Sequence, residues 1–220
     1  AAAPESELAR VRRLGDQRDP AGVPAAMDLL DQSLKSDRRD GQLTAITALA
    51  RLRHTAAAPA ILRTLEGPDD EALRMAATTA LADLRDTSAL RTALSHANPR
   101  VQAAALHALE QIPSGGLRAE DVVAVLFSDR PEARDAALWV ARRHADWGDA
   151  LAGSLRQRLL AGTPPPGGRD GLNSLLGGLM SSPAVQGLVA DVLTTVTTAQ
   201  VHPEARQGAL SAMAEHTPKN

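Results

Sequence analysis

The sequence predicts an all-α protein, a right-handed superhelix of about six helical pairs. The first observation is a helix-length apolar pattern, clearest in residues 98–112. Asn98 can accept hydrogen bonds from the first free N–H groups of a helix, and Pro99 suits its first turn. The apolar residues that follow recur at helical spacing: Val101, Ala104, Ala105, Ala108, Leu109 and Ile112.

The second observation is that this pattern repeats along the chain. Clear copies occupy residues 70–84, 131–141 and 203–213, and weaker copies occupy residues 5–14, 41–52 and 171–182. The apolar stripes end at Leu52, Leu84, Ile112, His144, Ser182 and His216, so the steps are 32, 28, 32, 38 and 34 residues. Steps of this size are typical of helical repeats that stack on one another.

Particular residues give the chain a family resemblance. The openings Asn98-Pro99-Arg100-Val101 and His202-Pro203-Glu204-Ala205-Arg206, followed by an Ala-x-x-Ala-Leu run, resemble those of the HEAT-repeat (armadillo-like) family in its short bacterial form. The resemblance covers nearly the whole chain. It implies the fold but says little about function, because such solenoids serve many unrelated roles.

The C-terminal third carries a narrower resemblance. Residues 182–193, 203–206 and 209–214 are similar to the solenoid region of large secreted bacterial haem-containing dehydrogenase-like proteins. That resemblance implies a scaffold beside a redox subunit of the cytochrome type. The chain has no cysteine, hence no Cys-x-x-Cys-His attachment site, and any haem would belong to another chain.

The first half of the chain divides into three expected pairs. Residues 5–14 pair with 23–34, in which Val23, Met27, Leu30 and Leu34 share a face. After a charged linker at 36–40, residues 43–52 pair with 57–65. Gly67 and Pro68 end that segment, and Asp70 caps the next helix, so that residues 73–84 pair with 88–94.

The second half continues the pattern with one interruption. Residues 101–112 pair with 121–127, and residues 133–144 pair with 150–160. Residues 162–170 are rich in proline and glycine and predict an irregular insertion within one domain spanning residues 1–220, because the repeat resumes at once. The sixth pair is 171–180 with 185–196; its first helix contains three glycines and should be the least stable.

The last copy, 203–215, has no second helix after it. Its inner face should consist of Ala205, Ala209, Ala212 and Met213, and one side of that face would be uncovered. We therefore expect further chain or a partner subunit to cover this end.

Charge and chemistry narrow the function. With 24 basic and 26 acidic residues, the composition gives no electrostatic reason to expect a nucleic-acid partner. The six histidines lie at 54, 96, 107, 144, 202 and 216, and no two of them have the i, i+4 spacing of a helical metal site. No serine stands in a Gly-x-Ser-x-Gly context. We expect no enzyme activity, and no catalytic, cofactor or metal site.

The leading hypothesis is a non-catalytic protein–protein interaction or scaffold module within a larger bacterial assembly. One alternative is a HEAT-scaffold enzyme such as a chromophore lyase, for which the chain has no matching acid or aromatic cluster. The other is a nucleic-acid-binding HEAT protein similar to the alkylpurine DNA glycosylases. Such proteins need a basic concave face and aromatic residues, and aromatics make up only 1% of this chain.

The candidate partner-binding residues come from two places. In HEAT-type stacks the second helices line the concave side, where Arg63, Arg91, Arg156 and Arg158 would lie; a merely solvated face is the other interpretation. Trp139 falls opposite the apolar stripe of its helix and could anchor a partner, because tryptophan is enriched at binding hot spots. Alternatively, Trp139 folds over a neighbouring loop, over Trp147.

Location is the least determined feature. No apolar run approaches the ~20 residues that span a bilayer, so we expect no direct membrane insertion. The chain opens Ala1-Ala2-Ala3-Pro4 without methionine, as an exported protein does after removal of a signal peptide. We expect a periplasmic or secreted protein. A trimmed cytoplasmic chain would look the same.

Overall fold

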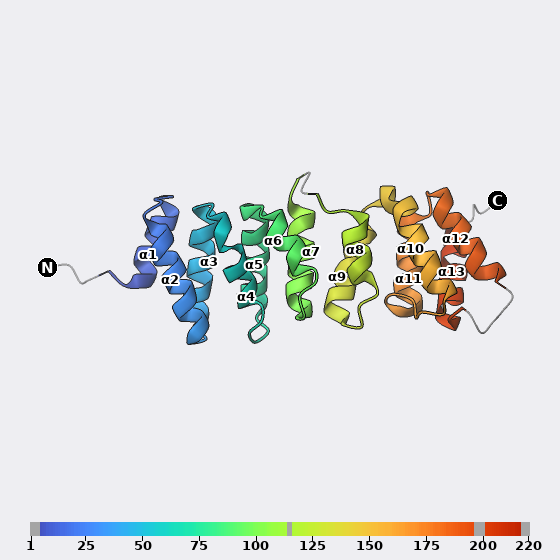
Figure 1. Cartoon of the computed structure of the whole chain (residues 1–220), viewed down its shortest axis with the longest axis horizontal. Coiled ribbons are helices and arrows are strands. Elements are labelled where there is room, and N and C mark those ends of the chain that lie inside the picture. The colour runs from blue at the N-terminus through green and yellow to red at the C-terminus, as the bar shows by residue number, and fades with distance from the viewer. Residues whose placement is uncertain (1–4, 114–115, 196–200, 217–220) are drawn as a thin grey trace. The chain divides into compact units, whose positions relative to one another are not determined.

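The computed structural model describes residues 5–113, 116–195 and 201–216. These residues form thirteen α-helices and two short 3-10 turns, and they include no β-strand (Figure 1). The expected all-α class is confirmed. The chain divides into two compact units, Ala1–Gly116 and Leu117–Asn220, which are described separately.

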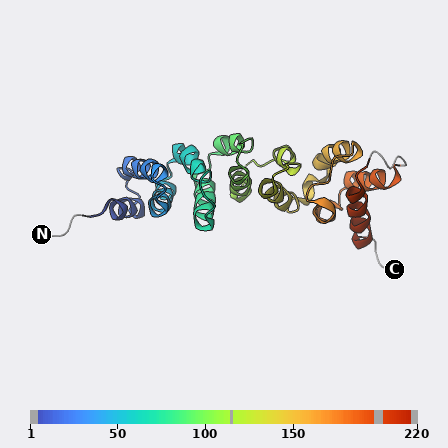
Figure 2. The ribbon, with the colours of Figure 1, turned by 90° about the horizontal axis from the view of Figure 1, so that it is seen from below.

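The N-terminal unit contains seven helices arranged in two rows (Figure 2). Helices α1, α3, α5 and α7 pack on one another in turn, and α2, α4 and α6 form the second row. The first and second helices of the three expected pairs that lie wholly in this unit therefore occupy different rows. The bounds are α1 Glu7–Asp16, α2 Gly22–Lys35, α3 Arg39–Arg51, α4 Ala58–Thr64, α5 Glu71–Leu84, α6 Thr87–Ala93 and α7 Pro99–Gln111.

The C-terminal unit has the same organisation. Helices α9, α11 and α13 form one row, and α8, α10 and α12 form the other. The bounds are α8 Ala119–Leu126, α9 Pro131–Ala141, α10 Gly148–Leu160, α11 Gly168–Leu179, α12 Pro183–Thr194 and α13 Pro203–His216. Helix α11 begins at Gly168, so residues 168–170 of the expected insertion are helical; the chain turns just before them through Gly167, at φ +68°.

The core consists mainly of alanine, leucine and valine. The stripe predicted on residues 98–112 is buried: Val101, Ala104, Ala105, Ala108, Leu109 and Ile112 are each at most 6% exposed. Small residues bring helices of a row close together. A Cβ atom on Gly15 would lie 2.9 Å from both Cα and Cβ of Ala48, so a glycine is needed where α1 crosses α3.

Short polar side chains begin several helices as the sequence predicted. Asn98 Oδ1 accepts from the Arg100 N–H at 2.9 Å, and Asp70 Oδ1 accepts from the Leu73 N–H at 2.9 Å. The helix ends are less regular. Arg85, the residue that follows α5, adopts φ +57°, a left-handed conformation usually taken by glycine.

Side-chain contacts join successive helices of a row at about one repeat step. In the N-terminal unit, Arg63 Nη2 donates to Asp31 Oδ1 at 3.0 Å across 32 residues. In the C-terminal unit, Ser182 Oγ donates to Asp149 Oδ1 at 2.6 Å across 33 residues. These separations match the spacing of the apolar stripes.

The last helix differs in part from the expectation. Ala205, Ala209 and Ala212 are at most 1% exposed, because α13 packs against α11 and α12. Met213 is 43% exposed, and Leu210, which the sequence did not single out, is 51% exposed. The inner face therefore consists of the three alanines and is covered within the unit, whereas Met213 lies at its edge.

Candidate functional site

A groove of about 730 Å³ runs between α4 and α6 in the N-terminal unit. It exists because both helices carry small side chains where they face each other. Ala56, Pro59 and Ala60 line one side, and Ala89 and Ala93 line the other. Ala60 and Ala93 are about as buried as core residues, at 6% and 5% exposure, and they form an apolar floor.

One ion pair and one histidine–carboxylate contact lie along the rim of this groove. Arg63 of α4 lies at one edge and is held by Asp31 of α2. Three residues after Arg63 along the chain, Glu66 Oε1 lies 3.6 Å from His96 Nε2. The Nδ1 atom of His96 accepts from the Asn98 N–H at 3.1 Å, so a neutral His96 carries its proton on Nε2, toward Glu66.

The groove combines an apolar floor with charged and polar groups at its rim. An apolar floor bordered by charges of both signs can take an apolar anchor while the rim fixes its orientation. Sequence reasoning found Arg63 but missed His96, Glu66 and the alanines. The signal that could have revealed the groove is the presence of alanines on facing sides of two consecutive second helices.

The other predicted arginines also bind neighbours in their own unit. Arg91 Nη2 donates to the carbonyl oxygen of Gly116. Arg156 Nε lies 2.7 Å from Asp191 Oδ2, which joins α10 to α12. The Arg158 guanidinium lies over the ring of Phe127, with its Cζ atom 4.7 Å from the ring centroid.

Trp139 lies on the surface of the C-terminal unit, with 39% of its area exposed. The Arg143 guanidinium lies over its ring at 4.8 Å from the centroid. The other tryptophan, Trp147, stacks on the ring of His144, with centroids 3.8 Å apart and planes 7° from parallel. The five predicted partner-binding residues are thus divided: Arg63 and Arg91 lie in one unit, and Trp139, Arg156 and Arg158 lie in the other.

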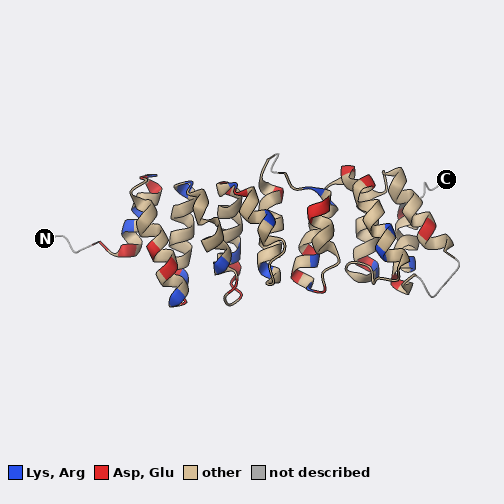
Figure 3. Ribbon diagram, in the orientation of Figure 1, with Lys and Arg blue, Asp and Glu red and all other residues tan. Residues whose placement is uncertain are grey.

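Charges of both signs are interspersed along the helices of each unit in Figure 3. In the N-terminal unit, burial lowers the pKa of His107; Arg74 lowers it further and Glu110 opposes the shift. Within the described residues, no three histidine, aspartate or glutamate side chains are grouped to hold a metal ion. None of the helices described here is both long enough and apolar enough to cross a bilayer.

Comparison with models of known protein families gives no match to this chain, and neither does comparison with curated protein sequences.

Proposed function

We propose that the protein is a non-catalytic interaction module of HEAT-like helical repeats, in which the groove between α4 and α6 binds a peptide segment of another protein. The observation that carries this proposal is the apolar floor of Ala60 and Ala93 between charged rims. The floor accepts an apolar side chain of the peptide. The rim pairs, Arg63–Asp31 and His96–Glu66, select its polar neighbours.

Rigid helices favour this mode of binding. Both walls of the groove belong to helices packed into the core, so the protein itself loses little conformational entropy on binding, and the main ordering cost falls on the peptide. Each Å² of apolar area that the peptide buries contributes about 25 cal/mol, before the cost of association. A groove of this size therefore suits a weak contact that other surfaces of an assembly reinforce.

Three further elements of the proposal rest on sequence resemblance and pattern. These are membership of a larger bacterial assembly, proximity to a redox subunit, and export to the periplasm or beyond. Each concerns the setting of the module rather than the binding groove.

The absence of cysteine provides a site-specific test. A photo-crosslinker attached to an Ala89→Cys variant would sit in the groove, and one attached to Thr79→Cys would sit on the exposed surface of α5. In native extract we expect a distinct crosslinked protein from position 89 and none from position 79. Ala56→Arg, which places a long side chain at the mouth of the groove, should abolish the product. Equal labelling at both positions, or no product at position 89, would reject the proposal.

A further inference from the structure

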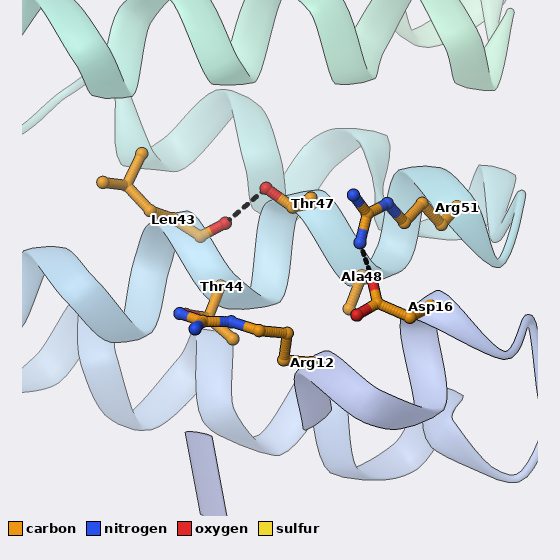
Figure 4. Close-up of a pocket in the computed structure, with 7 residues that line it drawn as sticks. All are labelled: Arg12, Asp16, Leu43, Thr44, Thr47, Ala48 and Arg51. Atoms are coloured by element: carbon orange, nitrogen blue, oxygen red, sulfur yellow. Dashed lines mark hydrogen bonds and ion pairs between the residues drawn. The ribbon is translucent and has the colours of Figure 1, made fainter. Parts of the chain in front are cut away.

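A second pocket lies between α1 and α3, in the other row of the N-terminal unit (Figure 4). Its volume is about 310 Å³, and it is separate from the groove between α4 and α6. Its walls carry two arginines, two threonines, one aspartate and two apolar residues: Arg12, Arg51, Thr44, Thr47, Asp16, Leu43 and Ala48.

The two threonines differ in what their hydroxyl groups bind. Thr47 Oγ1 donates to the Leu43 carbonyl at 2.8 Å, the usual arrangement for a threonine within a helix. Thr44 is only 9% exposed, yet its hydroxyl makes no hydrogen bond with any part of the chain that the structure describes. The hydroxyl oxygen of Thr44 remains accessible to solvent, so it can donate to a group bound in the pocket.

The two arginines differ in the same way. Arg51 forms an ion pair with Asp16, which fixes one edge of its guanidinium. Arg12 has no ion pair within the described residues, and it lines the pocket together with Thr44 (Figure 4). Because Asp16 neutralises only one arginine, the pocket keeps one net positive charge.

We propose that this pocket binds a single oxyanionic group, a carboxylate or a phosphate, between the Arg12 guanidinium and the Thr44 hydroxyl. Guanidinium nitrogens only donate hydrogen bonds, and the planar fork of Arg12 matches two oxygens of such a group. The Thr44 hydroxyl donates to the same group from the floor of the pocket. Arg51 remains bound to Asp16 at the wall of the pocket.

The test is a titration of the isotope-labelled full chain, followed by NMR, with inorganic phosphate in one arm and acetate in the other. Ionic strength is held constant with sodium chloride, so that general screening does not change during the titration. We expect saturable shifts at Arg12 and Thr44. The arm with the lower dissociation constant identifies the preferred source of the oxyanion.

Matched variants separate the site from its surroundings. Thr44→Val keeps the shape but removes the hydroxyl, and should weaken binding by about three- to tenfold, whereas Thr47→Val should change it less than about twofold. Thr44→Ser restores a hydroxyl and should restore binding. Arg12→Gln should weaken binding by about tenfold or more, and Arg10→Gln on the same helix should not.

Two outcomes would overturn the proposal. One is the absence of saturable shifts in both arms, which would mean that water satisfies Thr44. The other is equal weakening by Arg12→Gln and Arg10→Gln, which would reveal an adventitious ion attracted only by overall charge. Amide spectra of each variant establish that it is folded before its affinity is compared.

Discussion

Arg63 and Asp31 lie 32 residues apart in the sequence, and their side chains join at 3.0 Å across neighbouring helices of one row. Arg156 and Asp191 repeat the arrangement in the C-terminal unit at 2.7 Å. Two arginines that the sequence suggested as partner contacts therefore already connect successive second helices. A partner that uses them must bind the pair rather than a free cation.

The Arg63–Asp31 pair should add little to stability. Both side chains are about half exposed, so solvent screens their attraction, and a double-mutant cycle with Arg63→Ala and Asp31→Ala should give a coupling of about 0.5 kcal/mol. The coupling should decrease at high salt. Urea unfolding followed by circular dichroism measures it. A control cycle that combines Arg10→Ala with Asp31→Ala should give no coupling. A coupling energy above about 2 kcal/mol between Arg63 and Asp31 would contradict the prediction.

Two glycines of α10 should respond in opposite ways to replacement by alanine. A Cβ on Gly148 would lie 2.3 Å from Ser182 Cβ, whereas a Cβ on Gly153 meets nothing within 4 Å. We expect Gly148→Ala to destabilise the C-terminal unit by about 1–3 kcal/mol and Gly153→Ala to stabilise it by about 1 kcal/mol.

Tryptophan fluorescence is the appropriate probe for this comparison, because both tryptophans of the chain lie in the C-terminal unit. Its denaturation midpoint should fall for Gly148→Ala and rise for Gly153→Ala. A harmless Gly148→Ala would mean that α10 and α12 can separate at little cost.

Asn98 should stabilise α7 in two separable ways. Its Oδ1 accepts from the Arg100 N–H, and its Nδ2 lies 3.5 Å from the Leu65 carbonyl oxygen, at the end of α4. Asn98→Ala loses both contacts and should cost about 1 kcal/mol, while Asn98→Asp keeps the cap and should cost less. Hydrogen exchange at the first turn of α7 measures the loss of local stability in each of the two variants. Equal loss in the two variants would assign the effect to the Leu65 contact.

The pH dependence of the N-terminal unit should include a contribution from His107. Burial lowers the pKa of His107 below its ordinary value of 6.5, so the folded state favours the neutral ring and the unfolded state binds a proton more readily. The stabilising effect is complete above about pH 6.5 and is lost as the pH falls through the lower pKa of the folded state.

His107→Gln should remove this component. The other five histidines are unchanged in the variant, so the difference in unfolding free energy between about pH 7.5 and pH 5.5 should be smaller than in the parent chain. An NMR titration of His107 gives its pKa directly. A pKa at or above the ordinary value would refute the prediction.

The helices were predictable because their signals are local. Asn98 and Pro99 mark the start of α7, and the alanines that follow define its buried stripe. The left-handed end of α5 at Arg85 was not predictable, because a non-glycine residue takes that conformation only when its surroundings impose it. The fold class could thus be predicted, but individual helix ends could not.

The candidate site was predictable only in part. Arg63 could be assigned to the second-helix row from the repeat, but its contact with Asp31 could not. Repeat steps of 28 to 38 residues leave the register between neighbouring helices open, and register decides which side chains meet. The groove depends on the same register, since Ala60 and Ala93 form a floor only if α4 and α6 lie alongside each other at the observed level.

The contacts at one repeat step also bear on how the chain acquires its structure. Each such contact closes a loop of little more than thirty residues, so its entropic cost is low and nearly the same along the chain. Folding can then nucleate in any adjacent set of helices and extend outward in either direction. A destabilising substitution such as Gly148→Ala would slow the addition of helices near α10, while nucleation among α1 to α7 would proceed at its usual rate.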